Sequence, residues 1–262
     1  MTETPRRHLT WWLVATGVVT GVLAGLLGVG GGIIMVPAMT ALGFSRHRAT
    51  GSSLAAILLV AVAATVAFGA AGDVDVGTAV ALGLGGLVGS TLGAHWMNRL
   101  SGVTLARIFG VVLLAAGARM LLAGDVSGTG MGLPPIAALV VGVAVGILTG
   151  LLSGLAGVGG GIIMVPAMVL FLGMDQHAAE GTSLLAMMFT AAAGTRVNAK
   201  NKLIDWRAML ILGVAGAVVA PLAAGFAQQI PALTLGRLFG AFVLINAFRT
   251  LWKSRTPPIT PA

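Results

Sequence analysis

The feature that most constrains the fold is a twelve-residue segment that occurs twice without a change. It reads Gly-Val-Gly-Gly-Gly-Ile-Ile-Met-Val-Pro-Ala-Met and spans Gly28 to Met39 and again Gly157 to Met168. Each copy places a run of glycines inside a hydrophobic segment, and the apolar piece that follows is too short to cross a membrane. This pattern is typical of a helix broken at membrane depth, where the backbone is buried in protein or lines a cavity. We therefore interpret the two copies as the two halves of one binding site.

Composition places the chain in a bilayer. Of its 262 residues 57% are hydrophobic and 8% are charged, against about 25% charged residues in soluble domains. The net charge of +8 would suit nucleic acid, but the basic residues lie between apolar spans, where they set orientation, so no nucleic acid is expected. The chain has no cysteine and only four scattered histidines. Neither a metal site nor a cofactor is therefore expected.

The duplication extends through most of the chain. At an offset of 130 residues His47 aligns with His177, and Gly51-Ser52-Ser53 aligns with Gly181-Thr182-Ser183. The predicted domains are a first transmembrane repeat at 1–125, a linker at 126–134, a second transmembrane repeat at 135–255 and a cytoplasmic tail at 256–262.

Each repeat contains five apolar segments. They fall at about 9–27, 31–43, 50–70, 77–97 and 103–122, and at about 135–156, 160–173, 179–197, 206–226 and 232–252. A spanning helix needs about 20 residues, so four segments per repeat qualify and the second is a half-helix or a re-entrant piece. The predicted fold is an all-α integral membrane protein of two such repeats.

Loop charges predict that the two repeats have opposite orientations. Arg46 and Arg48 mark a cytoplasmic loop after the first short segment, whereas the equivalent loop at Asp175 has no Lys or Arg and is expected outside. Both termini are then cytoplasmic, in a multi-pass protein of the inner (cell) membrane. Inverted repeats with paired broken helices are a transporter architecture with a site near the midplane.

The predicted site centres on the glycines. A half-helix that starts near Gly32 or Gly161 points free N–H groups and the positive end of its dipole into a cavity, which suits an anion. Pro37 and Pro166 would reinforce the break. The alternative for the glycines is close helix packing. The candidate anion-binding residues of the two motifs are Gly30, Gly31, Gly32, Pro37, Gly159, Gly160, Gly161 and Pro166.

Hydroxyl groups near the motifs complete the predicted site. Ser52, Ser53, Thr182 and Ser183 begin a long helix in each repeat and either donate to an oxyanion or cap the helix. Ser53 and Ser183 are the preferred donors.

Charged residues supply fewer candidates. Arg107 and Arg237 lie about a turn inside their helices and are interpreted as snorkelling side chains, with a gate for anions as the alternative. His47 and His177 are expected in loops, as solvated side chains or as further gate residues. All acidic residues, Glu180 included, are expected at or near loops.

The chain resembles the sulfite exporter TauE/SafE family of membrane permeases. The resemblance lies in the paired glycine motifs, the Gly-Ser-Ser and Gly-Thr-Ser triplets and the histidines just ahead of them, and it covers about residues 10–252. It implies about eight membrane spans and transport of sulfite, organosulfonates or related sulfur anions.

The sequence therefore predicts a secondary transporter of small sulfur-containing anions that works by alternating access, and no enzyme. Two alternatives remain at this stage: a channel for the same anions, and a membrane scaffold subunit without a substrate. The sequence leaves open which anion is carried, in which direction and with which coupling ion. It also leaves open a homodimer.

Overall fold

The computed structural model describes residues 4–96, 102–122, 134–157 and 159–253, and all the regular structure in these ranges is α-helical. The first repeat contains α1 (Thr4–Leu27), α2 (Gly32–Ala41), α3 (Arg46–Ala70), α4 (Val76–Trp96) and α5 (Gly102–Leu122). The second contains α6 (Pro135–Ala156), α7 (Gly161–Leu172), α8 (Gln176–Lys200), α9 (Trp206–Ala227) and α10 (Ala232–Lys253). The predicted all-helical fold is confirmed. The predicted tail and residues 126–133 of the predicted linker lie outside the described residues.

Helix lengths confirm the predicted mixture of long and short elements. Within the described ranges, α1, α3, α4, α6, α9 and α10 are long and apolar enough to cross a membrane. The other two predicted spans are not among these six: α8 is too polar along its length, and only Gly110–Leu122 of α5 is described with its side chains. The short helices α2 and α7 contain 10 and 12 residues. At about 1.5 Å per residue they reach roughly half of a hydrocarbon core about 30 Å thick. Helices α3 and α8 begin earlier than expected, because their first turns are too polar for hydropathy to include.

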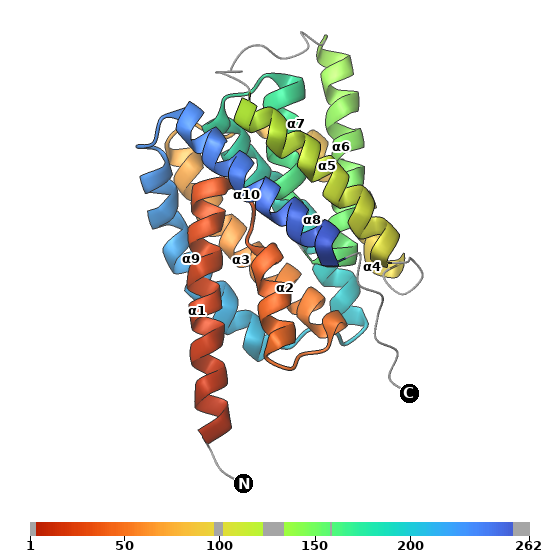
Figure 1. Cartoon of the computed structure of the whole chain (residues 1–262), viewed down its shortest axis with the longest axis vertical. Coiled ribbons are helices and arrows are strands. Elements are labelled where there is room, and N and C mark those ends of the chain that lie inside the picture. The colour runs from red at the N-terminus through yellow and green to blue at the C-terminus, as the bar shows by residue number, and fades with distance from the viewer. Residues whose placement is uncertain (1–3, 97–101, 123–133, 158, 254–262) are drawn as a thin grey trace.

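The main helix pairs each take one helix from each repeat, so the two repeats are interlocked. Helix α1 lies against α9 and α6 against α4, and α5 pairs with α10 and α3 with α8. Each of these contacts maps onto itself or onto another one when the repeats are exchanged. In Figure 1 the chain runs upward along α1 and downward along α6. The arrangement is consistent with inverted repeats, whose orientation in the membrane remains a prediction.

Glycines allow the crossing helices to approach very closely. Along α6, Gly146, Gly150 and Gly154 lie against the α4 backbone. A Cβ atom on Gly150 would collide with the Gly86 carbonyl and lie 2.8 Å from the Gly86 Cα atom. Gly21 of α1 meets the Gly216 carbonyl of α9 in the same way. Small residues at such crossings are characteristic of membrane helix packing, where backbone contact replaces hydrophobic burial.

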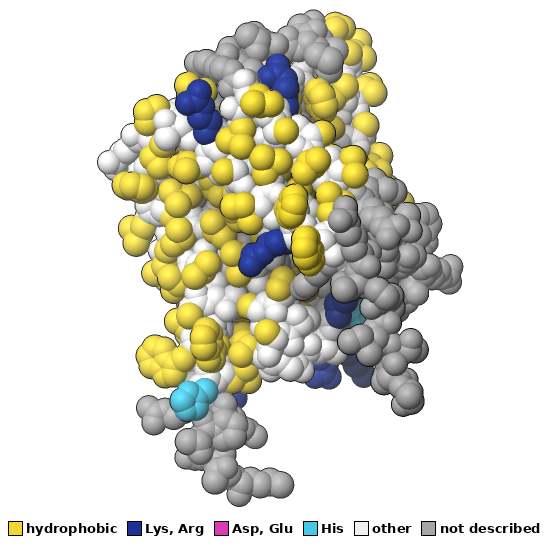
Figure 2. Space-filling view, in the orientation of Figure 1, with side chains coloured by type: hydrophobic (Ala, Val, Ile, Leu, Met, Phe, Trp, Pro, Cys, Tyr) yellow, Lys and Arg dark blue, Asp and Glu magenta, His cyan; other side chains and the backbone are white. Residues whose placement is uncertain are grey.

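The outer surface suits a bilayer. Large apolar side chains such as Leu84, Val140, Leu222 and Phe248 are exposed on the long helices. Figure 2 shows hydrophobic side chains over most of one face, and basic side chains mainly toward its ends. An apolar surface of this extent has no place in water, so the chain is a multi-pass membrane protein.

Orientation can be tested with single cysteines, since the chain contains none of its own. Ser45 is exposed at the start of α3, and Asp175 holds the equivalent place before α8 with its side chain 44% exposed. In intact cells an impermeant thiol reagent should label Asp175→Cys and spare Ser45→Cys, because the two loops are predicted to face opposite sides. Permeabilised cells provide the control, in which both should react. Equal labelling in intact cells would contradict the inverted arrangement.

Candidate functional site

The two glycine segments adopt equivalent broken conformations. Gly28, Gly30 and Gly31 have φ angles of 63°, 74° and 70°, and Gly157, Gly159 and Gly160 have 71°, 88° and 94°. Side chains other than hydrogen rarely tolerate this left-handed region. The predicted starts of the half-helices at Gly32 and Gly161 are confirmed.

The N-terminus of each half-helix lacks a side-chain cap. Gly31 and Gly160 occupy the N-cap positions, where no side chain accepts a hydrogen bond. The first backbone N–H groups of an α-helix have no partner within the helix, and the dipole adds partial positive charge there. Both half-helices therefore offer donors at the buried centre of the protein.

The two breaks touch one another. A Cβ atom on Gly161 would collide with the Gly28 carbonyl and lie 3.0 Å from the Val29 Cα atom. Gly30 and Gly159 face the same two side chains, Met187 and Ile57. The structure thus brings together the glycine residues that the sequence assigned to one site.

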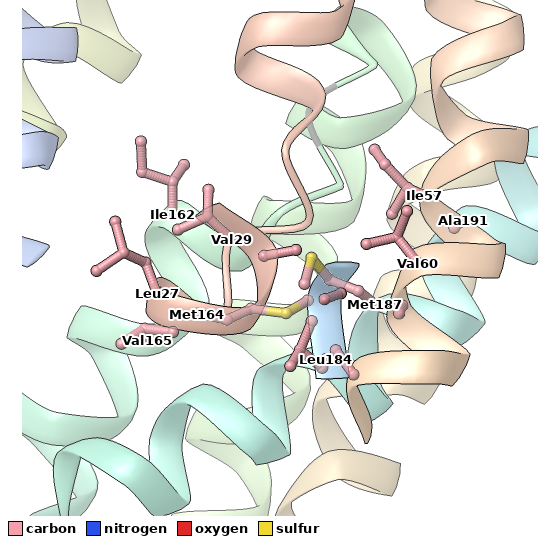
Figure 3. Packing of buried hydrophobic residues seen from close by; sticks show 14 of the residues in the cluster. Leu27, Val29, Ile57, Val60, Ile162, Met164, Val165, Leu184, Met187 and Ala191 are labelled. Carbon is pink, nitrogen blue, oxygen red and sulfur yellow. The ribbon is translucent and has the colours of Figure 1, made fainter. Parts of the chain in front are cut away.

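Apolar side chains fill the space beside the breaks. Val29, Ile57, Met164 and Met187 are completely buried. In Figure 3, Met164 and Met187 point toward each other beside the loop that carries Val29. An anion can reach the N–H groups only after these side chains move, so the conformation is closed at the centre.

Ser53 and Ser183 link each break to the opposite repeat. Ser53 Oγ donates to the Gly157 carbonyl at 2.9 Å, and Ser183 Oγ donates to the Gly28 carbonyl at 2.7 Å. Both serines are completely buried. Their hydroxyl protons therefore hold the breaks in this conformation, and direct donation to an anion stays a prediction.

The neighbouring hydroxyls bind a different pair of loops. Ser52 Oγ accepts from the Asp205 N–H at 2.8 Å, and Thr182 Oγ1 accepts from the Asp75 N–H at 2.9 Å. Their helices are capped earlier, since Ser45 accepts from the Arg48 N–H and Asp175 from the His177 N–H. The alternative prediction that the triplets cap these helices is wrong, because each helix starts almost two turns sooner.

Pro37 and Pro166 lie inside the half-helices rather than at the breaks. Each lines a groove against a long helix of the opposite repeat. The groove between α2 and α10 has a volume of about 600 Å³, and its lining combines apolar side chains such as Ile33 and Phe248 with the polar Asn246 and Arg249. The equivalent groove between α7 and α5 has about 350 Å³ and an entirely apolar lining that includes Ala116.

The predicted gate residues lie away from the breaks wherever their side chains are described. Arg237 is exposed on α10, and the side chain of Arg107 lies outside the described residues. His177 contacts Asp175 through Nδ1 at 3.3 Å, and its Nε2 faces the Ala227 and Ile230 carbonyls. His47 is partly exposed in the first turn of α3. Both histidines are thus in helices, and their expected place in loops is wrong.

Sequence reasoning missed several buried polar groups at the breaks. Thr20 lies against Gly31 and Thr149 against Gly160, so these threonines are a repeat pair that the 129-residue offset could have revealed. Thr190 Oγ1 donates to the Gly159 carbonyl at 3.2 Å. Glu180 lies inside α8 and is completely buried. Its expected place at a loop is wrong, because α8 already begins at Gln176 and Gly28 of the other repeat packs on the Glu180 backbone.

Comparison with known proteins gives concordant results. The protein-family model described as "Sulfite exporter TauE/SafE" matches residues 1–120 and 142–262. A "Probable membrane transporter protein" of Xylella fastidiosa (strain 9a5c) is 30% identical over 261 residues, which cover 92% of this chain and 94% of that protein. The counterpart from strain Temecula1 has the same identity and coverage.

A third relative matches part of the chain. The "Probable membrane transporter protein YunE" of Bacillus subtilis (strain 168) is 27% identical over 113 residues, and the match spans 41% of that protein. No solved structure gives a significant match. Because the family model covers both repeats, with their paired broken helices, the chain belongs to the TauE/SafE family of membrane transporters.

Proposed function

We propose that the chain is a secondary carrier of small sulfur-containing anions, such as sulfite and organosulfonates, and that the anion binds between the two breaks. The observation that carries this proposal is the contact between the two breaks at the buried centre of the fold, each of which leads into a half-helix with an uncapped N-terminus. Each end carries about half a positive charge and favours a nearby anion by roughly 0.3–2 kcal/mol. Two ends with their N–H groups would hold an anion weakly enough to release it again.

The groove between α2 and α10 offers an approach to the first break. It runs along Ile33 and Pro37 of the half-helix and carries the cationic side chain of Arg249. Proline removes the N–H that would bond the carbonyl four residues earlier, so the Ile33 carbonyl is free of that bond. The apolar lining of the equivalent groove makes the two approaches unequal.

The packed centre favours a carrier over a channel. Val29 and Met187 would have to move for each anion that binds, which fits alternating exposure of the site better than a continuous pore. A scaffold subunit without a substrate is the remaining alternative. A scaffold subunit would have no need of two broken helices in contact with each other.

Reconstituted protein can distinguish these functions. Proteoliposomes loaded with unlabelled sulfite should take up labelled sulfite faster than empty ones, because a carrier exchanges its substrate across the membrane. Thermal stability of the purified protein should rise with sulfite, thiosulfate, sulfate, sulfoacetate or taurine, in the order of their affinities.

The possible outcomes distinguish a carrier, a channel and a scaffold subunit. Uptake that does not saturate and is not accelerated by internal sulfite would favour the channel. Absence of both flux and thermal stabilisation across the five compounds would overturn the proposal and support a scaffold.

Ser53→Ala should weaken the apparent affinity for the anion about tenfold, equivalent to about 1.4 kcal/mol, through the loss of one hydrogen bond. The loss also leaves the Gly157 carbonyl without its donor in a buried position, so the melting temperature should fall. The KM for sulfite uptake and the melting temperature measure the two effects.

Ser52→Ala is the matched comparison, because it removes a partly buried hydrogen bond from the Asp205 N–H instead. A similar loss of stability with unchanged KM would assign the affinity effect to the break. An equal change in KM would show general loosening of the interface between the repeats.

A further inference from the structure

A residue with a buried carboxyl group packs against the first break through its backbone and Cβ atom. Glu180 in the second turn of α8 is completely buried, and its Oε1 accepts a bond of 2.7 Å from Gln176 Nε2. Its Oε2 has no hydrogen-bond partner, and neither does Gln176 Oε1. Among the described residues no Lys or Arg forms an ion pair with Glu180. A carboxylate in such a place is strongly disfavoured unless it binds a cation or a proton.

The backbone of Glu180 contacts the break directly. A Cβ atom on Gly28 would lie 2.7 Å from the Glu180 Cα atom and 2.9 Å from its Cβ atom. Ser183 Oγ bridges the two segments, because it lies 2.8 Å from the Glu180 carbonyl and 2.7 Å from the Gly28 carbonyl. Gly28 in turn touches Gly161 of the second half-helix. Gly28 therefore connects Glu180 both to the first break and to the start of α7.

The equivalent position in the first repeat has no carboxyl group. Thr50 lies against Gly157 as Glu180 lies against Gly28. Arg46, which is exposed, aligns with the buried Gln176. The acid is thus present in the second repeat and absent from the equivalent position in the first. A carrier built this way would differ chemically between its two directions of transport.

Other charged groups near Glu180 are mostly acidic. Asp175 precedes the same helix and contacts His177. Asp73 and Asp75 lie in the turn between α3 and α4, where the Asp73 carbonyl packs on Gly181 and the Asp75 N–H binds Thr182.

The remaining neighbours add little positive charge. On α10, Gly236 packs near Gln176 Oε1, and the next residue, Arg237, is exposed. The sequences of α6 and α7 contain no charged residue. The surroundings therefore favour uptake of a proton and oppose an anion while Glu180 is ionised.

We propose that Glu180 is the proton-binding residue of a proton–anion symport, an inference that rests on the anion-carrier function proposed above. The carboxylate takes up one proton from the side on which its pocket opens and becomes a neutral carboxylic acid. The anion then binds at the breaks without a like charge beside it. After the site opens to the other side, both the anion and the proton leave, and the carboxylate is regenerated.

The test uses proteoliposomes of the full chain and two probes, labelled thiosulfate and methanesulfonate, neither of which has a titratable proton near neutral pH. With the membrane potential clamped, an inward proton gradient of about one pH unit should accumulate either probe about tenfold, the ratio expected for one proton per anion. Entrapped pyranine should report acidification of the lumen as the probe enters.

Glu180→Gln keeps the shape of the side chain but cannot ionise. It should retain exchange of the probe, lose the accumulation driven by the gradient, and show a KM that no longer rises with pH. Asp175→Asn is the matched control, since asparagine also caps helices and Asp175 is partly exposed. This variant should accumulate the probe as the wild type does.

Each outcome decides the proposal. Accumulation by Glu180→Gln at the wild-type level would overturn it, and so would wild-type flux that neither responds to the gradient nor acidifies the lumen. In both cases the anion carrier would stand. Absence of flux of every anion in the wild type would overturn the carrier and the symport together. If Glu180→Gln does not fold, Glu180→Asp takes its place: the shorter acid should keep the pyranine signal and shift the pH at which KM rises, and an unshifted pH dependence would overturn the assignment of the proton to Glu180.

Discussion

Gly31→Val and Gly160→Val should each abolish anion flux while the protein still reaches the membrane. Both glycines have left-handed backbones, with φ angles of 70° and 94°. A β-branched residue resists this conformation at a cost of about 1–3 kcal/mol. At Gly31 a Cβ atom would also collide with Thr20. The half-helix N-terminus would turn or shift, and the N–H groups proposed to hold the anion would lose their direction.

Gly72→Val is the control for backbone strain alone. Gly72 has a φ angle of 86° in the turn between α3 and α4, and a Cβ atom there meets nothing within 4 Å. It should lose some thermal stability and keep its flux. Sulfite exchange in proteoliposomes, with the amount of folded protein measured by size-exclusion chromatography, makes the comparison. If both break variants exchange sulfite at the wild-type rate, the anion binds elsewhere and the glycines serve only helix packing.

Gly150→Val should prevent the two repeats from assembling. The added side chain would press on the Gly86 backbone and lie 2.9 Å from the Ser90 nitrogen. Overpacking costs about 1–3 kcal/mol when side chains can yield, and here the obstacle is the backbone of α4. We expect loss of the monodisperse species in detergent and a large fall in melting temperature. Gly21→Val should act similarly at the contact of α1 with α9.

Gly225→Val tests whether this effect comes from the crossing. Gly225 lies in α9, and a Cβ atom there meets nothing within 4 Å. Its replacement should leave the elution profile and the melting temperature close to those of the wild type. If Gly225→Val and Gly150→Val lower the melting temperature equally, the helices tolerate valine poorly in general. The close contact between α4 and α6 would then not explain the effect.

The fold follows from the sequence because its strongest signals are local. Apolar length separates the spanning helices from α2 and α7, and repeated glycines locate the breaks to within a residue. The starts of α3 and α8 were missed for a local reason too. Their first turns carry residues such as Arg46 and Gln176, which hydropathy assigns to loops, whereas Ser45 and Asp175 cap them as helices.

The site was predicted less completely, because its remaining parts depend on contacts between the repeats. Nothing in the sequence near Ser53 shows that its hydroxyl binds Gly157, which lies 104 residues away. From the sequence alone Glu180 is assigned to a loop, because the contact of Gly28 with its backbone joins residues about 150 positions apart. The predicted pairing of the glycine breaks succeeded because the duplication itself carries that information.

The crossed serine bonds have a consequence for how the two halves of the chain can change. Ser53 of the first repeat satisfies Gly157 of the second, and Ser183 of the second satisfies Gly28 of the first. A polypeptide that ended after one repeat would leave its own break without a donor. Two copies of it, inserted in opposite orientations, would supply each other. Any change in one glycine motif must therefore still suit a serine encoded in the other half.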